Sequence, residues 1–583
     1  MHKPFPLSSK KASYRVRRQL LEAMIFEGLI AYEELIQTGE SDSLFYLFGK
    51  KRIYRCKGRR MAFDRIRIKE DSIYQETLDH TLLDVTIEEL LDELTSDCDD
   101  KVRLRNELSQ TIKLCEWNNT HLLQPLSRRD SSYEELESEI IEGHPYHPCF
   151  KSRTGFTVED HEVYGPEAKQ SFTLKWVAVR RSKVRISVFE KERDFWKREL
   201  GPQVLEQLLE QLVSKKVSFE EYTFLPIHPW QWKSIQHLLS NSIEDGDILP
   251  LHVDGDRYRA TQSVRTLWNE TNPEKAYIKL PMNMVNTSSL RRLESHSVCA
   301  APYISDWIEQ VIQSDLYLQK TDSLCVLKEY AGVMFETDDE NLSELDGQLG
   351  AIWRESVHKF INDDEGAVPF TALMMIERDG RPFIDHWLKR YGTEKWVKRL
   401  IEVSVVPIWH LVVAHGIAIE AHAQNMILLH KNGWPTRVVL RDFHESVEFT
   451  KEYLADVRLV PAFEKIHERY KDAPVDQYYW MSSVEALREL IMDTLFVFHL
   501  SELSFLLDEQ FGYKEECFWN QVETSIFTHL HQYPALKNRH QQLQLTSDQI
   551  YVESLLTKKI QHIKDGDFHH LVKNVFSDNK LER

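Results

Sequence analysis

Two short segments carry the side chains best suited to binding a divalent metal ion. Glu420 and Asn425 come directly before one apolar stretch, and Asp442 comes just after a second one. The turn sequence 431–433 separates the stretches, and its Asn-Gly pair is a strong hairpin signal. Because a hairpin brings its ends together, we expect Asn425 and Asp442 to face one site, near Glu420. Such oxygen ligands suit Mg²⁺ bound to a nucleoside triphosphate, as in protein kinases. The alternative is a polar loop that only closes the hairpin.

Basic and hydroxyl side chains recur at strand spacing in the middle of the chain. Ser263 and Arg265 stand two positions apart, which would place them on one face of a strand. Further basic residues follow apolar stretches or alternate in the same way: Lys151, Arg153, Lys279, Arg291 and Arg292. Arginine offers a planar fork to phosphate or carboxylate, and lysine offers a point charge. In an acidic chain these clusters predict a polyanion pocket, whereas the alternative for each one is a solvated strand edge.

The histidines are predicted to be structural unless other evidence places them in the site. Four stand in or near the motifs: His144, His147, His228 and His422. His228 lies in an aromatic and proline-rich corner, 226–232, and we expect it to support the fold. No His/Cys spacing fits a closed zinc site. The sequence also lacks the nucleophile elbow of serine hydrolases and the phosphate-binding loop of common ATPases, so any ATP site belongs to a less common fold.

The elements that must position these residues divide the chain into three parts. Residues 1–138 are predicted to form a mainly helical lobe, with helices over 14–37 and 83–116 and a hairpin over 42–66. Residues 139–365 mix helices over 188–199 and 203–213 with strands over 172–179, 223–227, 260–265 and 276–280. Residues 366–583 are mainly helical apart from the metal-binding hairpin, and the acidic segment 336–344 reads as a surface loop.

Bulk composition limits the class of protein. A chain of 583 residues is too long to fold around one hydrophobic core. Its net charge of −19 makes general nucleic-acid binding a poor expectation. The seven cysteines include no C-x-x-C pair, which is typical of reduced thiols in a cytoplasmic protein. The N-terminus has no apolar segment typical of a signal peptide. The most apolar stretch, 405–419, is too short to span a bilayer and is predicted to be a buried helix.

Taken together and in order, the motifs resemble the NRPS-independent siderophore synthetases of the IucA/IucC, aerobactin-synthetase type. The similarity rests on Gly143-His144-Pro145, Leu225 to Pro229, Ser263 to Thr266, Lys279-Leu280-Pro281 with Arg291, Glu420 to Asn425, and Arg441-Asp442. It implies an α+β fold shaped like a cupped hand, with a thumb, fingers and a distantly kinase-like palm. It also implies that ATP and a carboxylate, usually citrate or a citryl monoamide, give an acyl-adenylate that an amine or hydroxylamine then attacks, so that AMP and pyrophosphate are released.

The resemblance also implies a role for each matching residue. His144, Lys279 and Arg291 would be catalytic and would hold the α-phosphate and the substrate carboxylates. ATP would be bound by Ser263, Arg265, Thr266, Lys279, Arg291, His422, Asn425 and Asp442. Glu420 and Asp442 would bind Mg²⁺, and Lys151 and Arg153 would contact the acid together with His144 and Arg291. The family further suggests a homodimer acting in iron acquisition, with small-molecule substrates and no membrane or nucleic-acid partner.

Two alternatives remain open on the sequence. A small-molecule kinase would use the same Asn425–Asp442 hairpin, although the chain lacks an H-R-D or H-x-D loop before Asn425. A non-catalytic anion-binding scaffold is the second alternative. Phe443-His444-Glu445 follows Asp442 where many family members have glycine, so the local loop is expected to differ. The segment from His144 to Phe156 is closer to members that take monoamide or monoester derivatives of citrate.

Overall fold

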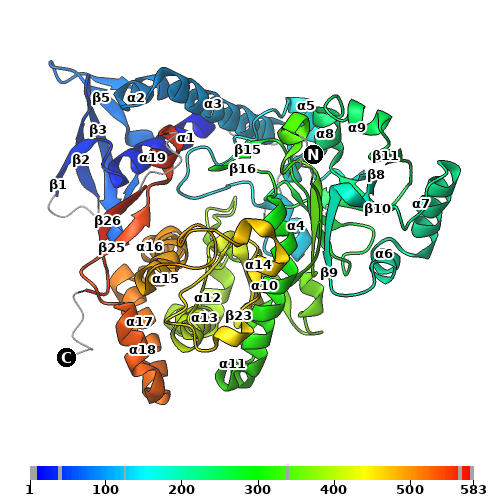
Figure 1. Cartoon of the computed structure of the whole chain (residues 1–583). Helices are drawn as coiled ribbons and strands as arrows, with labels where there is room; N and C mark the ends of the chain where they lie inside the picture. Colours follow the sequence, from blue (N-terminus) through cyan, green and yellow to red (C-terminus); the bar gives the residue numbers. More distant parts are fainter. Residues whose placement is uncertain (1–9, 37–41, 124–126, 337–339, 562–567, 578–583) are drawn as a thin grey trace.

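The computed structural model describes residues 10–36, 42–123, 127–336, 340–561 and 568–577 (Figure 1). Three of the expectations reach beyond this part of the chain. They are the absence of a signal peptide at residues 1–9, the end of the helix predicted to reach residue 37, and residues 337–339 of the predicted acidic loop.

The N-terminal lobe combines helices with a six-stranded antiparallel sheet, so it holds more strand than the sequence suggested. Helix α1 (Lys10–Phe26) is followed by Gly28, whose positive φ of 67° turns the chain away from the helix, and then by β1 (Ala31–Leu35). The predicted hairpin is present as β2 (Ser43–Phe48) and β3 (Ile53–Arg60). The sheet continues with β4 (Ile66–Ile68), β5 (Tyr74–Glu76) and β6 (Leu82–Asp84), and α2 (Ile87–Glu93) and α3 (Cys98–His121) follow.

The C-terminal end of the chain returns to this lobe, as Figure 1 shows where the red segment meets the blue one. The hairpin of β25 (Gln549–Glu553) and β26 (His569–Lys573) encloses α19 (Leu555–Ile560). Glu27 accepts hydrogen bonds from the backbone N–H groups of Leu556 (2.8 Å) and Thr557 (2.7 Å). One hydrophobic core therefore includes residues from both ends of the chain.

The middle of the chain is built on a seven-stranded antiparallel sheet in the order β7-β12-β13-β14-β19-β18-β9. The strands are β7 (Phe172–Thr173), β9 (Val184–Val188), β12 (Arg257–Ala260), β13 (Thr266–Asn269), β14 (Tyr277–Lys279), β18 (Glu329–Phe335) and β19 (Gly350–Arg354). A smaller sheet pairs β10 (Tyr222–Ile227), β8 (Lys175–Arg180) and β11 (Ile248–Leu251). Helices α6 (Glu192–Leu200), α7 (Pro202–Ser214) and α10 (Ser295–Ser314) accompany these sheets. Most predicted strands are confirmed, but 260–265 is a strand end followed by a turn.

The C-terminal part confirms the predicted hairpin. Strands β22 (Met426–Lys431) and β23 (Trp434–Leu440) pair antiparallel, with Met426 opposite Leu440. They form a four-stranded sheet with β17 (Leu324–Val326) and β20 (Gly366–Pro369). Around it lie α12 (Asp385–Tyr391), α13 (Thr393–His410), α15 (Val484–Ile491), α16 (Ser501–Phe511), α17 (Glu515–Gln532) and α18 (Lys537–Leu543) (Figure 1). The chain is thus an α+β protein, as predicted.

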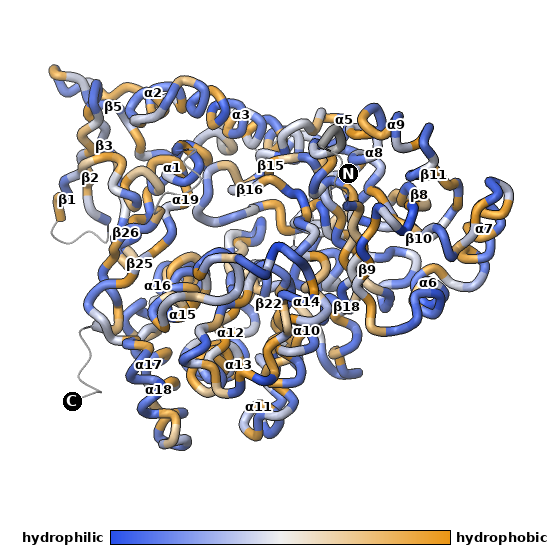
Figure 2. Tube along the Cα trace, viewed as in Figure 1, coloured by the Kyte–Doolittle hydropathy of each residue, from blue (hydrophilic) through white to orange (hydrophobic). Residues whose placement is uncertain are grey.

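One helical run, Val484–Phe511, has the length and composition of a membrane span, but 83% of its most apolar window is buried inside the protein. Figure 2 shows this region as a hydrophobic segment packed among other elements. The predicted buried helix over 405–419 is present up to His415, where α13 continues as a π-helical turn, η8 (Leu411–His415), and the last residues form β21 (Ile417–Ile419).

Candidate active site

A cavity of about 600 Å³ lies where the seven-stranded sheet, the open end of the β22–β23 hairpin and residues of the C-terminal part of the chain meet. Ten predicted site residues line it: His144, Ser263, Arg265, Thr266, Lys279, Arg291, Glu420, His422, Asn425 and Asp442. These residues come from segments up to about 300 positions apart in sequence, so the fold gathers the predicted motifs into one place.

The open end of the β22–β23 hairpin forms one wall of the cavity. The Arg441 backbone N–H donates to the Asn425 carbonyl (3.0 Å), and the Arg441 guanidinium donates to the Gln424 carbonyl (2.7 Å). The Asn425 amide in turn donates to the Glu420 carbonyl at 3.2 Å. The two ends predicted to meet are therefore fastened together. Asp442 has a positive φ of 66°, a conformation tolerated by aspartate and typical of constrained functional positions.

Asp442 is held between two cations from the neighbouring sheet. Its Oδ1 atom accepts from Lys279 Nζ at 3.2 Å and from Arg354 Nη1 at 2.8 Å. Burial alone would raise the pKa of Asp442, but Arg354, Lys279 and Arg441 outweigh it and hold that pKa well below its usual range. Asp442 is consequently ionised. The sequence analysis missed Arg354, and the only signal for it is an arginine at the end of the apolar stretch 350–353.

The predicted strand that would align Ser263 and Arg265 is instead a tight turn between β12 and β13. Val264 adopts a positive φ of 68°, and its buried side chain packs in a cluster with Phe156, Met282 and Met284. The Ser263 hydroxyl accepts the backbone N–H of Thr266 at 3.1 Å, which closes the turn. The alternating pattern was misread because the apolar residue at its centre anchors a turn, yet the turn still directs Ser263 and Arg265 to the cavity.

Positive charge is concentrated in this part of the cavity. Arg265 donates to the Arg292 carbonyl (2.6 Å) and Arg291 to the Asn286 carbonyl (2.5 Å), so both guanidinium groups are fixed without an acidic partner in these contacts. Burial lowers the pKa of Arg265 and Lys279, and burial together with Arg265 lowers that of Arg291 to about 9. Each lowered pKa means that the protein alone places too little negative charge near the cation to offset the cost of burying it. A bound polyanion would supply the missing negative charge.

The two predicted site histidines present the same ring geometry. His144 Nδ1 accepts the backbone N–H groups of Tyr146 (3.1 Å) and His147 (3.0 Å), and His422 Nδ1 accepts that of Gln424 (3.1 Å). A ring that accepts through Nδ1 while neutral carries its proton on Nε2. Burial, with added repulsion from His422, lowers the pKa of His144 to about 3. His144 is therefore a neutral hydrogen-bond donor.

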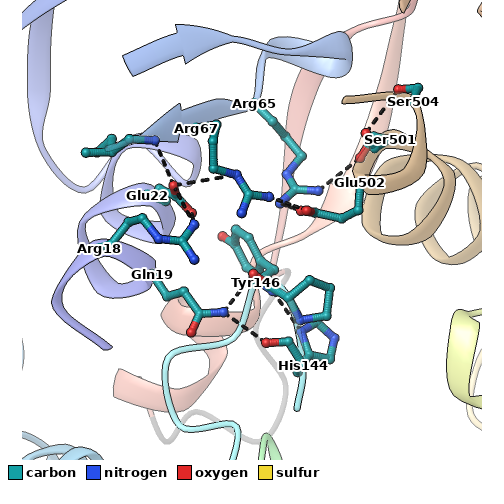
Figure 3. A network of polar contacts seen from close by, with 12 residues as sticks. Arg18, Gln19, Glu22, Arg65, Arg67, His144, Tyr146, Ser501, Glu502 and Ser504 are labelled. Carbon is teal, nitrogen blue, oxygen red and sulfur yellow. Dashed lines mark hydrogen bonds and ion pairs between the residues drawn. The ribbon is translucent and has the colours of Figure 1, made fainter. Parts of the chain in front are cut away.

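A polar network holds the His144 loop in place (Figure 3). Gln19 of α1 donates to the backbone carbonyls of His144 (2.9 Å) and Pro145 (2.7 Å). Beside it, Arg65 donates to Ser501 Oγ at 3.0 Å and pairs with the buried Glu502. Of the contacts drawn in Figure 3, those of Gln19 fix the His144 loop to α1, and those of Arg65 join the N-terminal lobe to helix α16.

The structure does not bring Lys151 and Arg153 to the cavity. Both are buried and pair with Glu167, with Arg153 making two contacts of 2.8 and 2.9 Å. Both cations are therefore directed at Glu167 inside the protein rather than at the cavity. His228 begins helix α8 (Pro229–Ile235), where its Nδ1 accepts the Trp230 N–H at 3.1 Å. These contacts agree with the structural role expected for His228.

Acidic side chains also line the cavity, and two of them were not predicted from the sequence. Asp493, in the π-helical segment η12 (Met492–Leu500), and Glu553, at the end of β25, both line the cavity near Glu420. Within the described part of the chain, Asp493 Oδ1 is buried and has no hydrogen-bond partner. Burial, followed by repulsion from Glu553, raises the pKa of Asp493. The cavity is thus lined by both cationic and acidic groups.

Comparisons with known proteins agree along the whole chain. The model described as "IucA / IucC family" matches residues 132–375, and that described as "Ferric iron reductase FhuF-like transporter" matches 394–567. Citryl-spermidine/3,4-dihydroxybenzoyl-citryl-spermidine:spermidine ligase of Bacillus anthracis is 38% identical, over 96% of this chain and 92% of that protein. The 2-[(L-alanin-3-ylcarbamoyl)methyl]-3-(2-aminoethylcarbamoyl)-2-hydroxypropanoate synthase of Staphylococcus aureus is 31% identical, over 96% and 91%.

Solved structures match equally well. The petrobactin biosynthesis protein AsbB of B. anthracis has a TM-score of 0.91 at 36% identity, with 98% of this chain and 96% of that chain covered. Aerobactin synthetase IucC of Klebsiella pneumoniae, at 22% identity, shares the fold with a TM-score of 0.82 over 98% of both chains.

We predict that Arg354→Met lowers the free energy of unfolding by about 2 kcal/mol, the size expected for losing a hydrogen bond between charged groups. Asp442 would keep Lys279 but lose its shorter contact. Urea denaturation measures the change, and Arg354→Lys, which keeps the charge, serves as the matched variant. Equal stability of Arg354→Met and the wild type would show that this ion pair does not fasten the hairpin to the sheet.

A second prediction concerns pH. Burial, with repulsion from Glu420 and Asp476, raises the pKa of Glu448 to about 8. This pKa is higher in the folded than in the unfolded protein. The contribution of the protonated Glu448 carboxyl to the free energy of unfolding is therefore complete at acidic pH and is lost as the pH rises through 8. Glu448→Gln should therefore become more stable relative to the wild type between pH 6 and pH 9, as measured by Tm. A Tm difference that is constant over this range would contradict the prediction.

Proposed function

The chain belongs to the IucA/IucC family, and we propose that it is an ATP-dependent ligase of citrate-based siderophore biosynthesis. It would activate a carboxylate of citrate or a citryl monoamide as the acyl-adenylate and join it to an amine, with release of AMP and pyrophosphate. The observation that carries the proposal is the group of poorly compensated cations, Arg265, Lys279 and Arg291, beside ionised Asp442 in one cavity.

In the first step a carboxylate oxygen of the acid attacks the α-phosphorus of ATP, and pyrophosphate leaves. Negative charge builds on the phosphoryl oxygens in the transition state, and preorganised donors stabilise it there. We assign this role to Lys279 and Arg291, with His144 as a neutral donor to the acid. Since His144 Nδ1 is occupied by two backbone N–H groups, its part is hydrogen bonding rather than proton removal.

The residues of the hairpin end fit Mg²⁺. Both cationic contacts to Asp442 go to Oδ1, which leaves Oδ2 for a metal, and Glu420 lines the same cavity. Oxygen donors of this kind suit a hard divalent cation. When bound, Mg²⁺ would neutralise charge on the triphosphate. Asn425 and His422, on the same segment, would line the nucleotide.

In the second step the amine nitrogen attacks the acyl carbon, the bond from that carbon to the adenylate oxygen breaks, and AMP leaves. The attacking amine must be neutral and must lose a proton, so a nearby base favours the step. Asp493 is suited to accept it because burial raises its pKa and its Oδ1 is free of other partners in the described residues. The acidic groups that line the cavity would also hold the ammonium groups of a polyamine, and the relative from B. anthracis is named for its use of spermidine.

Further properties expected from the family complete the proposal. We propose a cytoplasmic location, which the seven free cysteines support, since the structure pairs none of them. The homodimer and the cupped-hand description stay predictions. The AMP-forming reaction is favoured over the kinase alternative because the chain's relatives are named as ligases and synthases.

We expect the protein incubated with ATP, Mg²⁺, citrate and hydroxylamine, or with a citryl monoamide and a polyamine, to release AMP and pyrophosphate and to form the matching amide or hydroxamate. Arg291→Ala should lower kcat/KM by about 100-fold, the loss expected for one transition-state donor. Arg185→Ala is the matched control, because the Arg185 guanidinium pairs with Glu336 and Glu468 and does not line the cavity, and the loss should be much smaller. Release of ADP in place of AMP would favour the kinase.

Asp493→Asn should raise the KM for a polyamine by about tenfold, which corresponds to roughly 1.4 kcal/mol of binding, and should leave the KM for ATP unchanged. Glu489→Gln is the control, since Glu489 pairs with Arg488 and does not line the cavity. Steady-state kinetics with each substrate varied in turn measures both constants. An equal rise in both KM values would argue against an amine site at Asp493.

A further inference from the structure

Away from the cavity, two histidines and an aspartate converge at the far end of α10. His410 Nε2 lies 3.1 Å and His415 Nε2 lies 2.9 Å from the same atom, Asp315 Oδ2. The three candidate ligand atoms all lie within 4.8 Å of one another. Among the described residues, Asp315 forms its ion pairs with these two histidines alone. Two imidazole nitrogens and one carboxylate oxygen thus lie close enough together to share one small cation.

We propose that Asp315, His410 and His415 bind one divalent first-row transition-metal ion, with Zn²⁺ as the representative. Two imidazoles and one carboxylate are a ligand set used by such ions, and three protein ligands leave a position open for water. The neighbouring groups fit this assignment. Asp315 Oδ1 is occupied by the Leu318 N–H (2.8 Å), so the carboxylate is oriented with Oδ2 toward the histidines.

A further histidine lies behind the ligands in the position of an outer-shell partner. His410 Nδ1 is 2.8 Å from His529 Nε2, and the Tyr317 ring packs against both imidazoles. A metal-bound histidine generally donates its other N–H to such a partner, which fixes the ring and its tautomer. The His410 side chain is 3% exposed, whereas those of Asp315 and His415 are 13% and 20% exposed. Solvent therefore reaches the ligands from one side.

A second cluster in the protein shows what distinguishes this one. Glu336, His467 and Glu468 also lie close together, but Arg185 pairs with both carboxylates. An arginine already supplies the positive charge that a metal would bring there. Among the described residues, no arginine or lysine forms an ion pair with Asp315. The sequence offered no sign of the Asp315 site, because Asp315 and His410 are 95 positions apart.

The location connects the site with the catalytic cavity. His415 ends the π-helical turn η8, a feature often found at functional sites, and β21 then leads directly into Glu420. Asp315 follows α10, whose first turn carries Ser297, which donates to Glu445 of the cavity at 3.0 Å. An ion here would fasten the end of α10 to the segment that carries Glu420 (Figure 1).

The test uses the full chain after removal of metal with a chelator, in saturating Mg²⁺ so that hard oxygen sites are filled. Equilibrium dialysis should find one Zn²⁺ per chain, and Co²⁺ should give a visible absorption band. His415→Asn should weaken binding by about 100-fold, and His529→Gln by about tenfold, as expected for loss of an outer-shell partner. His467→Asn, in the arginine-paired cluster, should bind as the wild type does.

Thermal unfolding of the metal-free variants shows whether they are folded. Asp315→Asn is a second variant for the same ligand set, because its side-chain oxygen can still accept the Leu318 N–H. Loss of the bound Zn²⁺ in folded His415→Asn or Asp315→Asn supports the site. Absence of bound Zn²⁺ in the wild type, or equal binding by wild type and both variants, would overturn it. Neither result bears on AMP formation.

Discussion

The ionised Asp442 between Lys279 and Arg354 is the interaction on which the site depends. It joins the open end of the β22–β23 hairpin to strands β14 and β19 of the seven-stranded sheet, so two separate sheets share one buried charge. A buried carboxylate is stable only when paired, and breaking such a pair is strongly destabilising. The same two cations that hold Asp442 also face the cavity. The contact that fixes the hairpin therefore also preorganises the positive side of the site.

The charge of the whole chain explains why these cations are enclosed. A protein of net charge −19 repels anions at long range, so it can hold a polyanion only where local cations outweigh the surrounding field. Burial makes each of these charges act more strongly on a ligand because it excludes water. It also destabilises the cations themselves, as the lowered pKa of Arg291 indicates. A bound polyanion would relieve this strain, and Asp493 and Glu553 add negative charge to the lining of the same cavity.

The sequence predicted the parts of the site that follow from local patterns. The Asn-Gly turn fixed the register of the β22–β23 hairpin, and with it the meeting of Asn425 and Asp442. Alternating polar and apolar residues were a less reliable guide to the site. Val264 anchors a turn, and Lys151 and Arg153 pair with a buried glutamate. Arg354 and Asp493 could not be predicted, because each is brought to the cavity by pairing or packing of distant segments. Local spacing predicts such residues only when their partners are near in sequence.

The two ends of the chain show how far the site depends on long-range packing. Gln19 holds the His144 loop, while Glu27 binds the backbone of α19. From the same C-terminal segment, Lys559 donates to the Thr287 carbonyl at 2.8 Å, beside the loop that leads to Arg291. Residues from the beginning, middle and end of the chain thus support neighbouring walls of one cavity. Because each support comes from a different part of the fold, the positions of the cavity-lining donors depend on packing between segments that are distant in sequence.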